Sequence, residues 1–160
     1  MKSTFTLLVM ALLAGSMTFG QGSDLVAEKT KISSLCDLYS KAWATEDIDK
    51  FSALFAHTGD LVIFDGSSTY NGWEAWKKRL ETSFPSANDV KVTFRDQKIQ
   101  INTTGDAAFL TATEDVDYAD NGKPFSFKGM RVTWILVKMD GGITLLLPIR
   151  SKMELREKFQ

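Results

Sequence analysis

The spacing of the apolar residues changes once along this chain, near Asp89, and this change limits the folds that the chain can adopt. Before Asp89 the apolar residues recur every three or four positions, which is typical of amphipathic helices. After it they alternate with polar residues, which is typical of strands with one buried face. Helices followed by a run of antiparallel strands belong to the α+β class, in which the helices cover one face of a sheet.

The first half of the chain has the start and stop signals of three helices. Ser23 and Asp24 are suitable N-cap residues, and Asp47 can cap a second, shorter helix. We therefore expect a helix from Ser23 or Asp24 to Ala44, a short helix after Asp47, a buried strand over 61–64 that ends in a polar turn over 65–68, and a helix that begins at Asn71 and is ended by Pro85.

The second half predicts four long antiparallel strands, over about 90–101, 107–118, 123–136 and 143–149. The alternation changes face between Arg95 and Lys98 and again at Gly129, which indicates β-bulges. Asn121-Gly122 is typical of a two-residue hairpin turn. Pro148 indicates a sheet edge or a bulge, because proline has no N–H to donate. Such a bulged, curved sheet, wrapped around the long N-terminal helix, forms a cone with an open mouth.

Residues 1–20 have the three-part pattern of a secretory signal peptide. Lys2 supplies the positive start, the run from Phe5 to Leu13 is apolar, and the small residues Thr18 and Gly20 precede a cleavage point before Gln21. The apolar run is too short to span a bilayer, which takes roughly 20 residues. We therefore expect residues 21–160 to form one secreted or periplasmic domain with no membrane contact after cleavage.

The composition excludes several classes of protein. The 160 residues include 19 Lys and Arg against 20 Asp and Glu, a net charge of −1, which argues against a nucleic-acid partner. One histidine and one cysteine exclude sites that need two of either, so we expect no metal and no cofactor. Cys36 and Trp76 are interpreted as core residues, and Lys77, Lys78 and Arg79 as a solvated helix face.

The order and spacing of several short segments match a known superfamily. These segments are YSKAW at 39–43, DIDKF at 47–51, LFA at 54–56, DLVIFD at 60–65, NGWEAW at 71–76, GDAAF at 105–109, GMRVT at 129–133, KMDGG at 138–142 and RS at 150–151. The chain thus resembles the nuclear-transport-factor-2-like superfamily, in its SnoaL-like or ketosteroid-isomerase-like branch. This superfamily uses its cone as an enzyme pocket, a ligand pocket or a dimerisation module, so the resemblance implies the fold and leaves the function open.

The resemblance implies a catalytic pair. In bacterial ketosteroid isomerases a tyrosine on the first helix donates to the oxyanion and an aspartate at the end of this strand shuttles the proton, and Tyr39 and Asp65 match these positions. A carboxylate that faces an apolar cavity has a raised pKa, and a phenol can stabilise an enolate. In the other interpretation Asp65 caps the turn at 66–68 and Tyr39 packs in the core. The second acid of those isomerases is missing from 131–133.

The resemblance also suggests residues that line a ligand pocket. Arg131 matches an arginine that is frequent in SnoaL-like relatives, and it either anchors an anionic group or pairs with Asp65 or Glu114. Many relatives have inward histidines before the final serine, where this chain has apolar residues, which favours binding over catalysis. The expected lining residues are Trp43, Tyr70, Trp73, Arg131, Thr133, Leu147 and Ile149.

Two functions therefore remain open. The first is an exported protein that binds a small, partly apolar ligand with an anionic group, without catalysis. The alternative is an enzyme of the isomerase or polyketide-cyclase kind, with Asp65 as the general base and Tyr39 as the oxyanion donor. In either case we expect a homodimer through the outer face of the sheet, because the apolar side chains there would otherwise be exposed.

The signal peptide leads to a direct prediction. Amino-terminal sequencing of the protein exported by its native host is expected to begin at or very near Gln21, because the cleavage site lies between Gly20 and Gln21. Mature protein that retains Met1 would contradict the expected export.

Overall fold

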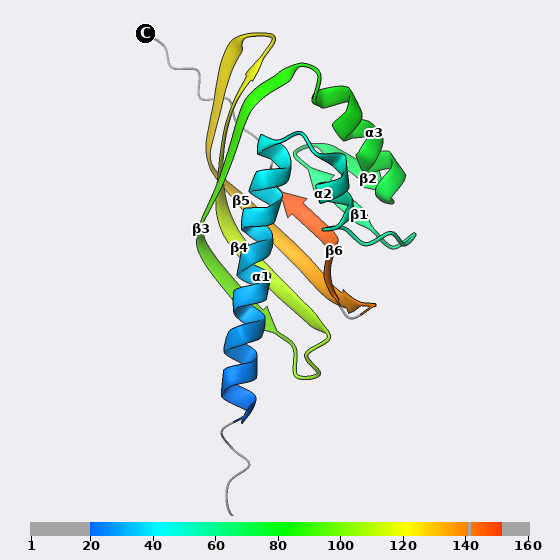
Figure 1. Ribbon diagram of the computed structural model, residues 1–160, viewed down its shortest axis with the longest axis vertical. Coiled ribbons are helices and arrows are strands. Elements are labelled where there is room, and N and C mark those ends of the chain that lie inside the picture. The colour runs from blue at the N-terminus through cyan, green and yellow to red at the C-terminus, as the bar shows by residue number, and fades with distance from the viewer. Residues whose placement is uncertain (1–19, 141, 152–160) are drawn as a thin grey trace, which may run out of the picture.

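One curved sheet and three helices on its concave side make up the fold (Figure 1). The computed structural model describes residues 20–140 and 142–151. The elements in chain order are α1 (Gly20–Ala44), α2 (Ile48–Ser52), β1 (Val62–Asp65), β2 (Ser68–Asn71), α3 (Trp73–Ser83), β3 (Ala87–Ile101), β4 (Ala107–Asp120), β5 (Lys123–Met139) and β6 (Gly142–Arg150). The sheet order is β2-β1-β6-β5-β4-β3, antiparallel except for the parallel pair β1–β6. The expected α+β class is therefore confirmed.

The helices agree with the sequence in number and differ at their starts. Asp47 caps α2 as expected, since its Oδ1 accepts a hydrogen bond of 3.0 Å from the Lys50 amide. The α1 helix begins at Gly20, so Ser23 and Asp24 lie inside it and the expected cap there is wrong. Most of the predicted signal peptide, residues 1–19, lies outside the described residues.

The β2 strand was not expected, because residues 65–68 were interpreted as a turn that leads into a helix. Instead, the chain reverses at Gly66, whose φ of 62° suits glycine, and Ser68–Asn71 pair with β1. Asn71 is the last residue of this strand, so the expected helix start at Asn71 is wrong. The α3 helix begins two residues later, at Trp73.

The three long strands β3, β4 and β5 are bulged where the sequence changes face. The pairing register shifts between Arg95 and Lys98, and it shifts again opposite Gly129, whose φ is 75°. Both predicted bulges are therefore confirmed, and so is the hairpin turn at Asn121-Gly122. A bulge bends the strand and increases its twist, so these sites curve the sheet around α1.

The β6 strand carries a further bulge that reverses the expected direction of its side chains. It lies between β1 and β5, so the expected edge position of Pro148 is wrong, but its register with β5 shifts at Leu146. Because side chains alternate along a strand, one extra residue exchanges the two faces. Pro148 and Arg150 therefore lie opposite the buried residues Trp134 and Val132, whereas Leu147 and Ile149 take the alternate positions.

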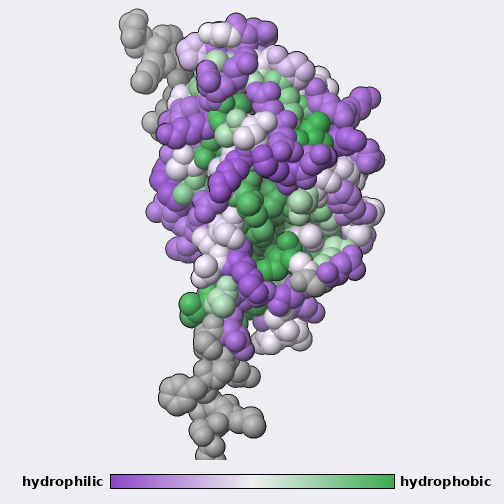
Figure 2. Space-filling model, viewed as in Figure 1, coloured by the Kyte–Doolittle hydropathy of each residue, from purple (hydrophilic) through white to green (hydrophobic). Residues whose placement is uncertain are grey.

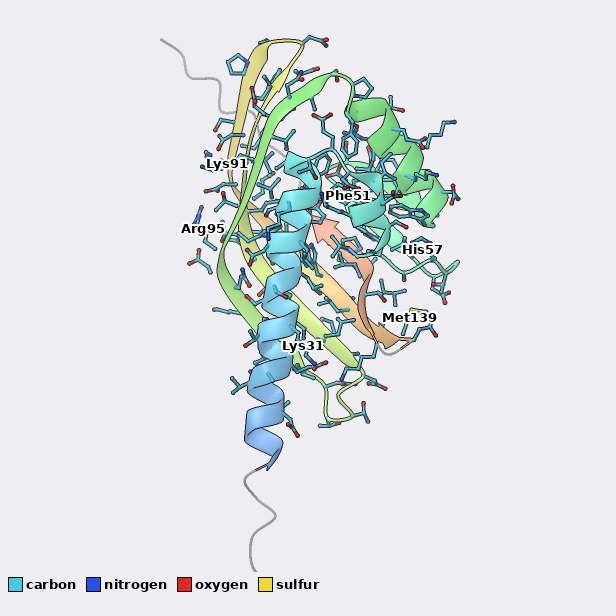
Figure 3. The ribbon with its side chains drawn as sticks, viewed as in Figure 1. Lys31, Phe51, His57, Lys91, Arg95 and Met139 are labelled. Carbon is cyan, nitrogen blue, oxygen red and sulfur yellow. The ribbon has the colours of Figure 1, made fainter. Side chains whose placement is uncertain are left out.

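The core fills the space between α1 and the concave face of the sheet. Phe51 of α2 is fully buried and points into this space, whereas Lys91 and Arg95 of β3 point away from it (Figure 3). The expected core roles of Cys36 and Trp76 are confirmed, and burial raises the pKa of the Cys36 thiol to about 12. Figure 2 shows apolar residues in a central hollow of the viewed face, surrounded by hydrophilic ones. Among the described helices, none is both long and apolar enough to cross a membrane.

Candidate functional site

Arg150, the last residue of β6, is the centre of a buried polar cluster. Its Nη1 donates to Asp65 Oδ1 at 3.2 Å, and its Nη2 donates to Glu114 Oε1 at 2.7 Å and to the hydroxyl oxygen of Tyr39 at 3.0 Å. The Arg150 side chain is 14% exposed and that of Glu114 is fully buried. We call these four residues the arginine cluster. It joins α1, β1, β4 and β6, which are far apart in the sequence.

The register of the sheet brings these side chains together. Asp65 and Arg150 are direct partners in the parallel pair β1–β6. Glu114 lies on β4, on the buried face that also carries Ala112 and Val116, and β5 separates it from β6. The β6 bulge turns the Arg150 side chain toward the concave face, and from there it is long enough to reach across β5. The cluster therefore depends on the fold and cannot form within one segment.

Burial determines the charges in the cluster. Burial raises the pKa of Glu114, and Asp65 raises it further, while Arg150 acts in the opposite direction. Burial alone would lower the pKa of Arg150, but Glu114, Tyr39 and Asp65 outweigh it and the pKa is raised. Burial also raises the pKa of the Tyr39 hydroxyl, against the effect of Arg150. Tyr39 is thus a neutral phenol and Arg150 a permanent cation.

Glu114 accepts a hydrogen bond through only one of its two oxygens. Arg150 Nε lies 2.6 Å from Glu114 Oε2, but the N–H does not point at that oxygen, so the contact is an ion pair without a hydrogen bond. Within residues 20–140 and 142–151, Oε2 has no other hydrogen-bond partner. One guanidinium thus donates to two carboxylates and a phenol, and both of its terminal nitrogens are engaged within the protein.

Two cavities adjoin the arginine cluster. The smaller has a volume of about 20 Å³, is lined by all four cluster residues and has room for about one water molecule. The larger has a volume of about 300 Å³ and is lined by Asp65 and Arg150 but not by Tyr39 or Glu114. Its wall is mainly apolar, and its polar rim comes from the end of α3 and the end of β4. The apolar residues are Trp43, Ala87, Val90, Val92, Val116 and Phe127, and the others are Arg79, Thr82, Ser83, Ser86, Tyr118 and Asp120.

Of the aromatic residues expected to line a pocket, Trp43 lines the larger cavity. Tyr70 packs edge-on against Trp76, with ring centroids 5.2 Å apart, and Trp73 stacks on His57 at 5.1 Å. Neither Tyr70 nor Trp73 lines either of the two cavities. Trp73 is therefore a core residue and Tyr70 packs against the core.

The expected contact between Asp65 and Arg131 is wrong, because Arg150 takes that place. Arg131 is exposed, because it alternates along β5 with the buried Val132. Neither Arg131 nor Thr133 lines one of the two cavities. The same alternation explains the side-chain directions in β6. After the bulge at Leu146, Pro148 and Arg150 point inward, and Leu147 and Ile149 do not.

The inward direction expected for Leu147 and Ile149 is therefore wrong. Ile149 is 37% exposed and contributes to the edge of the smaller cavity, while Leu147 lines neither cavity.

Three residues at the site were not identified from the sequence as site residues. Glu114 had a visible signal, because it is a charged residue in the buried register of an otherwise apolar strand, and such a group needs a cation nearby. Arg150 had no such signal, since its direction depends on the bulge before it. Arg79 was interpreted as part of a solvated helix face, but it lines the larger cavity.

The raised pKa of Glu114 predicts how stability depends on pH. Above its ordinary pKa of 4.5 the unfolded chain loses this proton, whereas the folded chain keeps it to a higher pH. The contribution of Glu114 to the free energy of unfolding is therefore lost as the pH rises from about 4.5 through the folded-state pKa. In urea titrations at several pH values, the stability of the wild type relative to Glu114→Gln is expected to fall over this range. A difference that rises with pH would mean that Arg150 outweighs burial.

The comparison with known proteins agrees with this architecture. The family model of the SnoaL-like domain matches residues 32–146. No curated protein matches the sequence. The solved structures described next have sequence identities of 13–17% to this chain, so the likeness concerns the fold alone.

Three of these structures illustrate the range of the fold. A candidate scytalone dehydratase from Novosphingobium aromaticivorans has a TM-score of 0.74 at 14% identity, over 84% of this chain and 89% of that one. A nuclear transport factor 2-like superfamily protein from Salmonella enterica has a TM-score of 0.74 at 13% identity, over 85% and 98%. A protein of unknown function with a cystatin-like fold from Nostoc punctiforme has a TM-score of 0.64 at 17% identity, over 80% and 92%. The chain belongs to the family of the SnoaL-like domain, and it shares its fold with the nuclear transport factor 2-like protein.

Proposed function

We propose that this protein binds a small, mostly apolar molecule in the larger cavity without changing it chemically. The observation that carries the proposal is a cavity of about 300 Å³ with an apolar wall, at whose base Arg150 is already bound by two carboxylates and a phenol. This volume lies at the lower end of the range for ligand pockets, roughly 300–1,000 Å³. An apolar ligand of two or three rings gains free energy there simply by leaving water.

The separation of Tyr39 from the larger cavity argues against acid–base catalysis. A proton-shuttling enzyme needs its base and its oxyanion donor on the same substrate. Asp65 lines the larger cavity, but Tyr39 lines only the smaller one, where the volume of about 20 Å³ excludes a carbon skeleton. The Tyr39 oxygen also accepts a hydrogen bond from Arg150, and Asp65 is held by the same guanidinium.

We propose in addition that the domain is exported and dimeric. Export rests on the signal-peptide pattern of residues 1–20. The dimer rests on apolar side chains on the outer face of the sheet, of which Phe109 on β4 is 47% exposed. Light scattering of residues 21–160 at micromolar concentration is expected to give twice the mass of one chain. The mass of a single chain, unchanged in Phe109→Ser, would contradict the dimer.

Filling the larger cavity tests the proposed binding. Naphthalen-2-ol is expected to bind the wild type, as measured by its fluorescence, and to lose its binding in Val90→Trp, because the indole occupies the same space. Thr93→Trp is the matched control, since it adds the same ring to an exposed position of the same strand and is expected to keep the binding. Binding that survives in Val90→Trp, or is absent from the wild type, would contradict the proposal.

An isomerase or polyketide-cyclase-type enzyme is the second candidate, and one observation favours it. Asp65 Oδ1 is paired with Arg150, but no hydrogen-bond donor among the described residues contacts Oδ2, so this oxygen could take a proton. Such an enzyme would move a proton from the carbon beside a carbonyl to Asp65 and return it to the far carbon of the double bond. Conversion of a bicyclic β,γ-unsaturated ketone to its conjugated isomer, lost in Asp65→Asn, would favour this enzyme over the binding protein.

A further inference from the structure

Arg79 is a cation at the rim of the larger cavity that has no ion-pair partner among the described residues. Within residues 20–140 and 142–151, no carboxylate oxygen lies within 4.0 Å of its guanidinium, although the side chain is half-buried and lines the cavity. The hydroxyls beside it donate within α3 and its C-terminal turn: Thr82 to the Lys78 carbonyl at 2.8 Å and Ser83 to the Arg79 carbonyl at 2.6 Å. The guanidinium is thus a cationic donor at this rim that remains for a ligand.

The lining of the larger cavity also offers an acceptor. Asp65 lines the cavity and its side chain is 15% exposed. Oδ1 accepts from Arg150, whereas Oδ2 has no donor from any described residue. A carboxylate oxygen in an apolar surrounding is a strong acceptor for a hydroxyl group. The cavity therefore has an acceptor at its base, a cationic donor at its rim and apolar walls between them.

The rim also carries one anion, Asp120. Its Oδ1 accepts from the Asn121 side chain at 3.1 Å, and no cation is within ion-pair distance of it among the residues described. Burial raises the pKa of the nearby Tyr118 hydroxyl, Asp120 raises it further and Arg79 lowers it, so both charges act on this part of the wall. At the base, Asp65 and Arg150 compensate each other, and Glu114 lies behind Arg150.

We propose that the ligand has a carboxylate that binds Arg79 at the rim and a hydroxyl that donates to Asp65 Oδ2 at the base, with an apolar ring system between them. This inference rests on the proposed binding function and adds the polarity and the orientation of the ligand. A guanidinium can hold a carboxylate through two parallel hydrogen bonds, which a lysine cannot do. Asp120 repels the same carboxylate and so restricts it to the Arg79 side of the rim.

Three probes with one ring system test the two ends separately. They are naphthalen-2-ol, 2-naphthoate and 6-hydroxy-2-naphthoate, which carry the hydroxyl, the carboxylate and both. The probe with both groups is expected to bind most tightly. Arg79→Gln is expected to weaken the two carboxylates at least about tenfold, as for a hydrogen bond to a charged group, and to leave naphthalen-2-ol within about twofold. Arg79→Lys is expected to restore part of this loss, because it keeps the charge without the paired donors.

Three further variants complete the test. Lys78→Gln removes the same charge from an exposed neighbour on α3 that lines neither cavity, and it is expected to change all three affinities less than about twofold, since solvent screens it. Asp120→Asn is expected to strengthen the binding of both carboxylates, because it removes the repulsion. Asp65→Asn is expected to weaken only the two probes that carry a hydroxyl.

The outcomes separate this inference from the function on which it rests. If none of the three probes binds to the wild type, the proposed binding function is wrong. If the probes bind but Arg79→Gln affects them no more than Lys78→Gln does, the cavity is a binding site and the inferred polarity of its ligand is wrong. Thermal unfolding of each variant well above the temperature of the binding assay ensures that a lost affinity is not a lost fold.

Discussion

Burying a guanidinium inside a small protein is costly unless its charge is paired and hydrogen-bonded, and the arginine cluster supplies two carboxylates and a phenol from three other elements. Asp65, Glu114 and Tyr39 each contact Arg150, and the carboxylate of Glu114 is fully buried. Loss of one partner leaves a charge without its counterpart, which is strongly destabilising. The cluster therefore fixes how β1, β4 and β6 are aligned against α1, and it permits little change in register.

The cavities follow from the sizes of the side chains around this cluster. On one side of it, large rings fill the cone: Tyr39, Phe94 and Trp134 pack with centroids 5.2–5.8 Å apart. On the other side, β3 and β4 present Val90, Val92 and Val116 to the interior, which are too small to fill the same width. The larger cavity is thus the space that valines leave where aromatic residues would close the cone.

Most of the fold could be predicted because alternation along the strands is readable in the sequence. The bulges at 95–98 and at Gly129 were visible, since the apolar residues on either side of them change between even and odd positions. Pro148 indicated an edge or a bulge in the last strand, but the position of the bulge at Leu146 was not visible, because residues 145–147 are all leucine and any register buries one of them. The β2 strand was missed for a related reason, since its four residues are polar or aromatic and none of them is buried.

The site was predicted less well than the fold, and the two arginines show why. Arg131 lies between Met130 and Val132, which are both buried, so alternation already indicates that its side chain points outward. The resemblance to SnoaL-like relatives gave the opposite expectation, and the local pattern was the better guide. Arg150 could not be assigned at all without the bulge. A charged residue in a buried register, such as Glu114, was the one signal that a cation must lie inside.

The division of charge between base and rim has a consequence for selectivity within the family. The fold serves many functions, so the groups that remain free determine what each member binds. Here the central arginine is paired with two carboxylates, and the second oxygen of Asp65 is left without a donor among the described residues. The residues at the rim then determine whether a neutral or an anionic ligand binds. There Arg79 and Asp120 carry opposite charges and do not form an ion pair with each other. Because these two residues are outside the arginine cluster, the rim can change without loss of the fold.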